Sequence, residues 1–237
     1  MNVFTAEIIG TFLLIVLGDG VVANVVLTKT KGNNGGWIVI TFGWAIAVFT
    51  GVFVAGKVSG AHLNPAVSVA LAYLGQIKLD ALPLYLGGQM IGAMLGAFVV
   101  WVCYRQHFDV TNEAANKLAV FCTGPAIRNA GFNFVTELVG TFILVFGVLF
   151  MVKPANSLGA LDALPVALLV LGIGLSLGGP TGYAINPARD LGPRIMHAIL
   201  PIKGKGTSDW SYSWIPVIGP LLGGILAAII YQFFGQP

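Results

Sequence analysis

The tripeptide Asn-Pro-Ala occurs twice in this chain, and no other feature restricts the possible folds as strongly. Asn64-Pro65-Ala66 and Asn186-Pro187-Ala188 each follow a stretch of Gly and small residues and open a short apolar segment. Asn is a preferred N-cap, and Pro is tolerated at the first helical position because its missing N–H would have no partner there. One copy alone would indicate no more than a helix start. Two copies, about half a chain apart, indicate two half-helices that meet inside a membrane.

The composition places the chain in a membrane. Of its residues 57% are hydrophobic and 9% charged, and the mean hydropathy is +0.88, whereas a soluble domain carries about 25% charged residues. The net charge of +3 is too small and too scattered to indicate a nucleic-acid partner. Cys103 and Cys122 show neither CxxC spacing nor a His partner, so we expect unpaired cysteines rather than a disulfide or a metal site. No nucleophile–base pair and no kinase, hydrolase or P-loop signature is visible, so we expect neither an enzyme nor a cofactor.

Six segments are apolar over the roughly 20 residues that a membrane span needs. They cover about 4–27, 37–55, 83–104, 134–152, 163–177 and 214–234. The segments 65–74 and 187–196, which follow the two Asn residues, are too short to cross and are predicted to be re-entrant. The predicted fold class is an all-α membrane protein with six transmembrane helices plus two re-entrant half-helices.

The two halves of the chain repeat each other. At an offset of 130 residues, Glu7, Gly10, Thr11, Phe12 and Leu14 are identical to Glu137, Gly140, Thr141, Phe142 and Leu144. At an offset of 122, Gly60 and Asn64–Ala66 are identical to Gly182 and Asn186–Ala188. At an offset of 127, Gly92 and Gly96 are identical to Gly219 and Gly223. Each repeat has three spans, an odd number, so the second repeat must cross the membrane in the orientation opposite to the first. We expect one transmembrane channel domain over 1–237, with repeat one at about 1–105, repeat two at about 134–237 and a connecting loop over 106–133.

Two half-helix N-termini that face each other predict a centre that rejects cations and admits neutral polar molecules. A helix N-terminus carries roughly half a positive charge and unsatisfied N–H donors. The side-chain amides of Asn64 and Asn186 are expected to donate to a passing hydroxyl or water while their carbonyl oxygens cap the half-helices. Unwound backbone at 56–63 and 178–185 would supply acceptors. This pattern is typical of a channel for neutral polar solutes that excludes protons and ions.

Several charged residues fall inside the predicted membrane segments. Glu7 and Glu137 occupy matching positions, which favours a structural role in which each accepts hydrogen bonds from the N–H groups of a re-entrant loop. An intramembrane carboxylate also suits proton coupling, so the alternative function is a proton-coupled secondary transporter of a small organic acid that uses Glu7, Glu137 or Asp19. Arg189 lies one turn into the second half-helix, where its planar fork suits a diol or a carboxylate; snorkelling to the interface is the alternative.

The stretches SGAHLNPAV and GYAINPARDLGP, each in its expected half, resemble the aquaporin superfamily (the major intrinsic proteins) and its bacterial glycerol-facilitator, or aquaglyceroporin, branch. The resemblance covers nearly the whole chain. It implies a selectivity filter of Trp44, Gly174, Tyr183 and Arg189, in which the small Gly174 leaves room for a wider solute. Trp44 and Tyr183 would form an apolar corner opposite Arg189. The remaining implied positions are His62, which with Glu7 and Glu137 would support the loops, and Asp190, Arg194 and Pro216, which fit the glycerol branch.

The chain departs from this resemblance at two positions. The branch usually has Phe where this chain has Tyr183, whose hydroxyl either contacts the solute or is idle. Asp19 lies in the first span, where an apolar residue is expected, and its repeat counterpart is Leu149. We expect Asp19 at a vestibule, or else in a helix contact without a transport role. The expected solutes are glycerol and similar polyols and water, with a range that extends to protonated lactic acid, dihydroxyacetone or hydrogen peroxide.

The resemblance further implies a homotetramer with one pore per subunit, embedded in the plasma membrane with both termini cytoplasmic. That orientation opposes the positive-inside tendency. It places Lys57, Lys78 and Lys153 inside, and Lys29, Lys31, Arg105, Lys117, Arg128, Lys203 and Lys205 outside. We keep this orientation because the short tails carry almost no charge.

Overall fold

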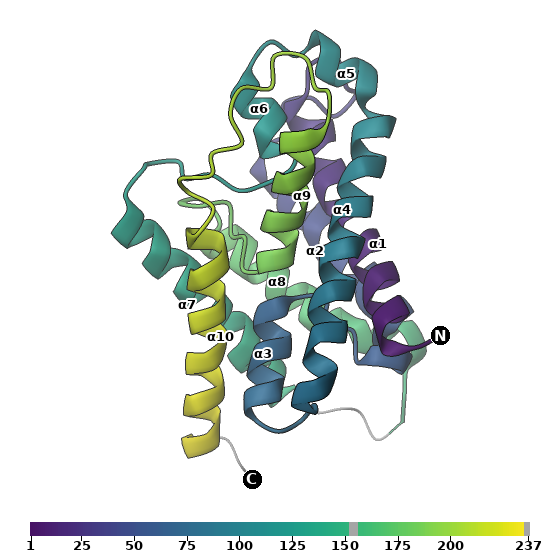
Figure 1. The fold of residues 1–237 in the computed structure, drawn as a ribbon, viewed down its shortest axis with the longest axis vertical. Coiled ribbons are helices and arrows are strands. Elements are labelled where there is room, and N and C mark those ends of the chain that lie inside the picture. The colour runs from purple at the N-terminus through teal and green to yellow at the C-terminus, as the bar shows by residue number, and fades with distance from the viewer. Residues whose placement is uncertain (152–155, 235–237) are drawn as a thin grey trace.

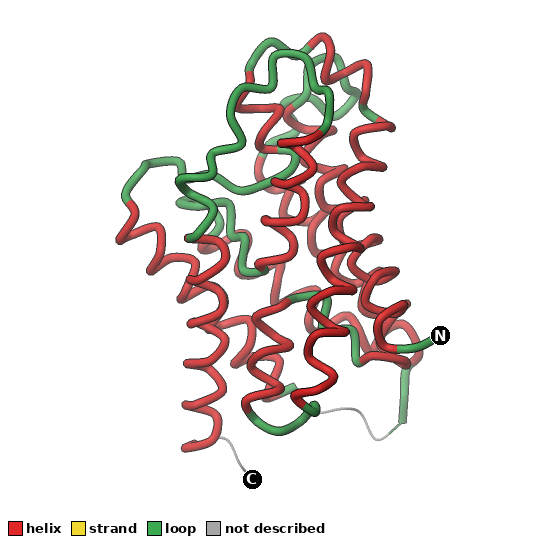
Figure 2. Tube along the Cα trace, viewed as in Figure 1, coloured by secondary structure: helices red, strands yellow, loops and turns green. Residues whose placement is uncertain are grey.

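The computed structural model describes residues 1–151 and 156–234, a part of the chain that contains helices and no strands. Figure 1 shows most of the long helices running roughly along one long axis, and Figure 2 shows loops at the two ends and also in the middle of the bundle. Within the described residues, six helical segments are long and apolar enough to span a membrane, as predicted, and two of them include the 3-10 turn that precedes the helix. They are α1 (Val3–Val26), α2 (Trp37–Ser59), α4 (Leu82–Cys103), α7 (Ala130–Phe150), α8 (Leu164–Leu177) and α10 (Ile215–Phe234), with the 3-10 turns η1 (Leu79–Ala81) and η2 (Gly159–Ala163) leading into α4 and α8.

The two predicted half-helices are also present, as α3 (Pro65–Tyr73) and α9 (Pro187–Ile199). Helix α9 continues three residues beyond the predicted end, and the other predicted ends agree with the structure within about four residues. The predicted end of the fourth span at 152, and Lys153, lie outside the described residues.

The connection between the repeats is more ordered than its polar composition predicts. It contains α5 (Arg105–Val110) and α6 (Ala114–Ala119). Phe108 in α5 is fully buried, and its ring packs against Phe121 at 5.6 Å between centroids. Helices of six residues are not stable alone, because nucleation is costly, so this packing holds them in place. No periodicity in so short a segment could have predicted them.

Each repeat is held together by close contacts of its first and third spans. A Cβ at Gly92 of α4 would overlap the carbonyl oxygen of Ile8 in α1, and a Cβ at Gly223 of α10 would overlap that of Leu138 in α7. Gly88 and Gly219 likewise face Glu7 and Glu137. The structure therefore matches Gly88 with Gly219 and Gly92 with Gly223, one helical turn away from the sequence pairing at offset 127. The glycines of α4 recur every four residues, so both alignments of the repeats pair Gly with Gly. Only the helix contacts show which alignment is correct.

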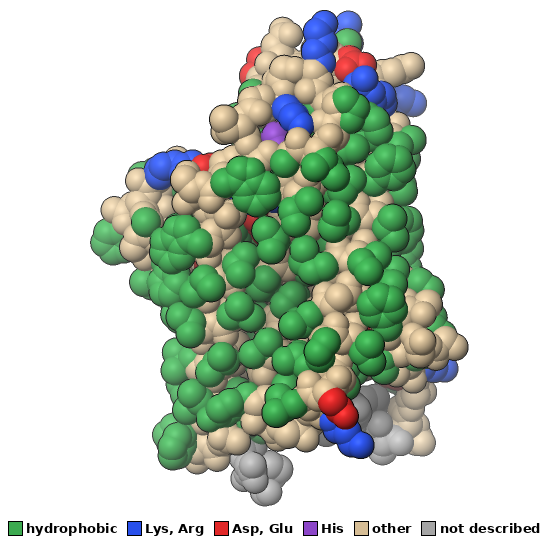
Figure 3. All heavy atoms as spheres, in the orientation of Figure 1, with side chains coloured by type: hydrophobic (Ala, Val, Ile, Leu, Met, Phe, Trp, Pro, Cys, Tyr) green, Lys and Arg blue, Asp and Glu red, His purple; other side chains and the backbone are tan. Residues whose placement is uncertain are grey.

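The repeats interlock through the half-helices. Both α3 and α9 contact α4 and α10, so each half-helix packs on the third span of both repeats, and α2 packs against α8 to close the bundle. In Figure 1, α9 and α3 follow one another along the long axis, and the N-terminus and the end of α10 both lie in the lower half. On the face drawn in Figure 3, hydrophobic side chains cover the middle and charged ones gather at the two ends, as expected for a chain surrounded by lipid. The chain is a multi-pass membrane protein.

Candidate pore

The two half-helices begin at Asn64 and Asn186, as predicted. The Oδ1 of Asn64 accepts from the N–H of Ala66 at 2.9 Å, and the Oδ1 of Asn186 accepts from those of Ala188 and Arg189 at 3.1 and 3.2 Å. Pro65 and Pro187 occupy the first helical position in each case. The helix starts that these tripeptides predict are therefore confirmed.

The two Asn side chains also join the repeats. The Nδ2 of Asn64 donates to the carbonyl oxygen of Ile185 at 2.7 Å, and the Nδ2 of Asn186 donates to that of Leu63 at 2.8 Å. These crossed bonds fix the half-helix N-termini against each other. The sequence-based expectation assigned both amide donors to the solute; one of the two N–H groups of each amide is instead used by the opposite loop, which leaves one for a solute.

Glu7 and Glu137 hold the unwound backbone before each half-helix. Each carboxylate accepts hydrogen bonds from two consecutive backbone N–H groups at 2.8–3.0 Å, which belong to His62, Leu63, Ala184 and Ile185. Glu7 also accepts from the side chains of Ser59 and Gln89. Both carboxylates are buried. The geometry expected for a loop-supporting pair is present in both repeats.

These loops are strained, and the strain explains why they need such support. Leu63 and Ile185 have φ values of 52° and 42°, and Ala61 and Tyr183 have 51° and 39°. Non-Gly residues rarely adopt the left-handed region, and a β-branched residue such as Ile185 does so least. Sequence reasoning did not predict this, because nothing in the residues Leu and Ile signals a left-handed backbone.

His62 packs beside the first loop. Its ring stacks on Tyr85 with centroids 4.2 Å apart, and its Nδ1 lies 3.0 Å from the Oγ of Ser68. The Tyr85 hydroxyl in turn donates to the carbonyl oxygen of Ser59 at 2.9 Å. His62 thus links α3 to α4 at the base of the loop.

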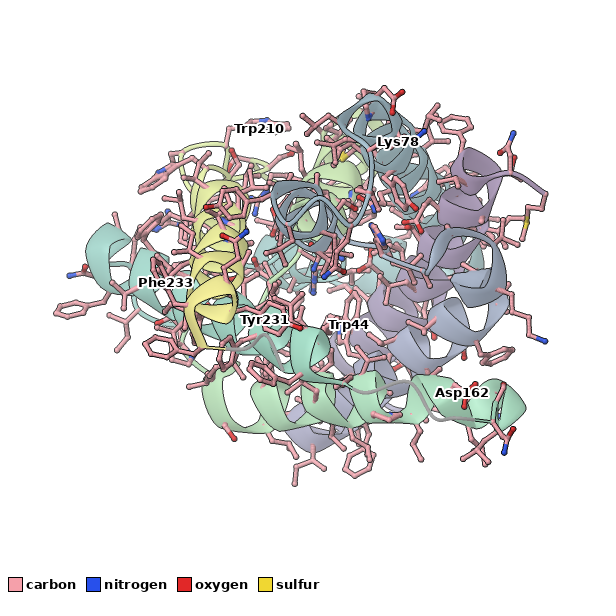
Figure 4. All side chains as sticks on the ribbon, turned by 90° about the horizontal axis from the view of Figure 1, so that it is seen from below. Trp44, Lys78, Asp162, Trp210, Tyr231 and Phe233 are labelled. Carbon is pink, nitrogen blue, oxygen red and sulfur yellow. The ribbon has the colours of Figure 1, made fainter. Side chains whose placement is uncertain are left out.

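A cavity of about 1340 Å³ runs past both Asn residues. Its lining combines the unwound loops and the two Asn side chains with apolar surface from Leu14, Val48, Val52, Leu144, Val148 and Val170. Trp44, Tyr183 and Arg189 also line it. In the view along the long axis in Figure 4, Trp44 lies near the middle of the bundle, and Lys78, Asp162 and Trp210 lie toward its periphery.

Three of the four residues expected to form a filter come together. The guanidinium carbon of Arg189 lies 4.3 Å from the centroid of the Trp44 ring, a cation–π distance. Tyr183 lines the same cavity, and its hydroxyl has no hydrogen-bond partner among the described residues. This places an apolar ring surface and a fixed charge at one passage, while the Tyr183 hydroxyl is buried over Gly174.

Gly174 does not line the cavity, and the space it leaves is filled by protein. A Cβ at Gly174 would lie 2.8 Å from Cζ of Tyr183. Trp37, which sequence reasoning did not single out, donates from Nε1 to the Gly174 carbonyl at 3.0 Å and meets the Tyr183 ring edge-on at 5.7 Å. Gly174 therefore acts through Tyr183: the absent side chain lets the ring lie back against α8. The one sequence signal for Trp37 was its place at the start of a span, where Trp usually marks only the membrane interface.

Asp190 and Arg194 anchor α9 and do not reach the cavity. The Nη2 of Arg194 lies 2.8 Å from Oδ1 of Asp190, both side chains are fully buried, and Asp190 also accepts from the N–H and hydroxyl of Thr123. Arg194 donates to the carbonyl oxygens of Thr123 and Ser208. The pair therefore ties the half-helix to the connecting segment and to the loop after α9.

Asp19 does not lie at a vestibule. Its side chain is 0% exposed and is absent from the lining of the cavity. It lies on the face of α1 that also buries Ile15 and Val22, at the i−4 and i+3 positions. The sequence could not tell the two faces of α1 apart, because the helix is apolar all round.

An inverted pair of three-span units, with two Asn-capped half-helices meeting beside one shared cavity, defines a transmembrane channel of the re-entrant type. Comparison with known proteins gives the family. The chain belongs to the major intrinsic protein family, whose model matches residues 1–231. Channels and facilitators make up this family, and the chain is not an enzyme.

The similar proteins span the whole chain. The probable glycerol uptake facilitator protein of Thermotoga maritima is 57% identical over 234 residues, covering 98% of this chain and 99% of that one. The aquaglyceroporin of Plasmodium falciparum, a crystal structure, superposes with a TM-score of 0.86 at 34% identity and covers 98% of this chain and 95% of its own. The D/L-lactic acid transporter of Lactiplantibacillus plantarum is 40% identical, with 97% of both chains covered.

Proposed function

We propose that this chain is a passive channel for glycerol and similar small polyols in the plasma membrane. The observation that carries the proposal is the corner in which the Arg189 guanidinium lies against the Trp44 ring, with Tyr183 on the same cavity. A polyol has a carbon side and a hydroxyl side, and this corner offers an apolar surface and fixed donors to match them. The names of the similar bacterial proteins support the same solute.

The mixed polar and apolar lining of the cavity suits the passage of an uncharged polyol. The hydroxyl groups of the solute exchange hydrogen bonds with the unwound loops and with the free N–H of Asn64 and of Asn186. The carbon chain of the solute meanwhile contacts Leu14, Val48 and the other apolar lining residues. The positive ends of two half-helices meet midway, so a cation or a hydronium ion meets a repulsive field in low dielectric. Trp44, Tyr183 and Arg189 serve as the filter, and Gly174 positions the Tyr183 ring.

The channel also carries water and other small neutral solutes, including protonated lactic acid, dihydroxyacetone and hydrogen peroxide. The resemblance to a lactic acid transporter supports the acid in particular. The neutral acid is the permeant form, since the anion would lose its hydration in the narrow passage.

Neither Glu7 nor Glu137 can serve as the proton-accepting carboxylate that the alternative function, a proton-coupled transporter, requires. Both are buried and occupied by backbone N–H donors in equivalent ways. A carrier needs a carboxylate that is free to take up and release a proton as the solute moves. Holding a strained loop is incompatible with that cycle.

The assembly proposed is a homotetramer with one pore per subunit, each subunit a single channel domain of two repeats, and with both termini cytoplasmic. The location of the N-terminus and of the end of α10 in the same half of the bundle supports termini on one side. Native mass spectrometry in a mild detergent tests the tetramer. Protease accessibility of a C-terminal tag in sealed vesicles tests the orientation.

Stopped-flow light scattering of proteoliposomes tests the proposed transport. Vesicles exposed to a glycerol gradient should reswell much faster with the protein than without it, and an uncoupler should not change the rate. A channel never concentrates its solute. Uptake of labelled glycerol above the external concentration, or its collapse with the uncoupler, would instead establish a coupled carrier.

A further inference from the structure

Trp37 lies behind the Tyr183 ring, on the side away from the cavity. Tyr183 lines the cavity, whereas Trp37 and Gly178 are absent from its lining. The two aromatic rings meet edge-on with their centroids 5.7 Å apart. A Cβ at Gly178 would lie 2.5 Å from Cδ1 of Tyr183 and 2.7 Å from Cζ2 of Trp37. Both rings therefore rest on the same end of α8, and Trp37 fills the space into which the Tyr183 ring would otherwise withdraw.

Packing alone holds the Tyr183 ring in its position. The Tyr183 hydroxyl has no hydrogen-bond partner among the described residues, and the residue has a φ of 39°, in the left-handed region that non-Gly residues rarely adopt. A side chain without a polar anchor keeps one position only where its neighbours leave no other room. Gly174 provides the room that the ring occupies, and Trp37 bounds that room on one side.

Trp37 is itself fixed by a hydrogen bond to the end of α8. Gly174 is one of the last four residues of α8, whose carbonyl groups lack an intrahelical partner. Nε1 of Trp37 donates to the Gly174 carbonyl oxygen at 3.0 Å. This bond holds the indole ring against α8 although 39% of Trp37 is exposed.

The same face of α2 also carries Trp44, another wall of the filter. Trp37 and Trp44 are seven residues apart, about two helical turns, and therefore lie on one side of α2. Trp44 lines the cavity, and its ring centroid lies 4.3 Å from the guanidinium carbon of Arg189. One helix thus supplies Trp44 directly and supports the Tyr183 ring through Trp37.

We propose that Trp37 is a positioning residue that sets the width of the passage at the filter. The inference rests on the proposed polyol channel and deepens it, because it identifies what limits the size of the solute. Trp37 does not contact the solute. It prevents the Tyr183 ring from moving away from the cavity, so the passage stays narrow and polyols bulkier than glycerol are held back.

Reswelling of proteoliposomes in glycerol and in xylitol, a bulkier five-carbon polyol, tests this role. Trp37→Leu removes the indole ring and its N–H donor but keeps an apolar side chain. The xylitol-to-glycerol ratio should rise about two- to tenfold, the change in the population of ring positions that the loss of one edge-to-face aromatic contact allows. Trp37→Phe keeps a ring without the donor and should give a smaller rise.

Gly174→Ala should change the ratio in the opposite direction. Its methyl group would push the Tyr183 ring toward the cavity, so the ratio should fall. In the double variant with Trp37→Leu, the displaced ring has the space that the indole leaves, and the ratio should lie between those of the two single variants. A double variant with a ratio no higher than that of Gly174→Ala would overturn the proposal.

Trp210→Leu is the matched control. Trp210 is also partly exposed, at 49%, but it lies toward the periphery of the bundle (Figure 4), so its replacement should leave the ratio at the wild-type value. A general loss of packing would lower both fluxes without changing their ratio, so an unchanged ratio in Trp37→Leu would overturn the proposal. If that variant does not fold, Trp37→Phe decides by the same criterion. Wild-type vesicles that reswell in glycerol no faster than empty vesicles would instead refute the proposed function.

Discussion

Replacing either loop-holding glutamate by Gln should destabilise the protein by a similar amount in the two repeats. In each repeat, one carboxylate oxygen accepts from one backbone N–H and the other oxygen from the next: His62 and Leu63 for Glu7, Ala184 and Ile185 for Glu137. A Gln side chain keeps one acceptor and replaces the other by an NH₂ group. One buried N–H then loses its partner in either variant.

The loss of stability can be estimated from the one buried backbone N–H group that loses its acceptor. A buried N–H left without a partner costs about 1–3 kcal/mol, so Glu7→Gln and Glu137→Gln should each cost about 1–3 kcal/mol. The extra donors to Glu7 add little, because Gln89 also donates to the Ser68 hydroxyl and the Ser59 hydroxyl can turn to another acceptor. Changing Glu to Ala should cost about twice as much, since both N–H groups of the pair lose their partner.

Unfolding in mixed micelles, followed by SDS titration, measures these differences. Glu113→Gln is the matched control, because Glu113 is exposed in the connecting segment and such surface changes usually stay within about 0.5 kcal/mol. Glycerol flux per folded channel should fall in both loop variants, since the strained loop relaxes. A Glu7→Gln protein as stable as the wild type, or an effect confined to one repeat, would refute the assignment of equivalent loop-holding roles.

Three further predictions concern the filter and the helix contacts. Gly174→Ala should lower glycerol flux and cost about 1–3 kcal/mol, because the new methyl would lie 2.8 Å from the Tyr183 ring; swelling rates and unfolding measure both, and an unchanged flux would contradict the indirect role of Gly174. Tyr183→Phe should leave the ranking of lactic acid and glycerol unchanged, because the hydroxyl is buried over Gly174, and lactic acid uptake in the wild type should fall as pH rises above the pKa of lactic acid; a changed solute ranking would mean that the hydroxyl reaches the solute. Gly92→Ala and Gly223→Ala should destabilise the protein by similar amounts, about 1–3 kcal/mol each. Gly172→Ala is the control and should not, because its methyl group would meet open space. Unequal costs for the first two would contradict the structural alignment that pairs Gly92 with Gly223.

The fold could be predicted from the amino-acid sequence because a membrane leaves a chain few options. Backbone polar groups must be satisfied internally within lipid, so apolar length predicted the spans and the two Asn-Pro-Ala starts predicted the half-helices. The odd number of spans per repeat then required an inverted second copy. Glu7 and Glu137 could be assigned to the loops because their symmetric positions pointed to one shared role.

The directions of side chains, and what they meet across the bundle, emerged only from the folded arrangement. Helices that are apolar on all sides carry no signal for their inward face, so Asp19 was expected at a vestibule and lies instead on a fully buried face of α1. The room left by Gly174 was assigned to the solute, but it belongs to the Tyr183 ring, because contacts between α8 and the loop before α9 depend on distant segments. The crossed bonds of Asn64 and Asn186 have the same origin: each joins residues more than 120 positions apart, and no local pattern encodes such a meeting.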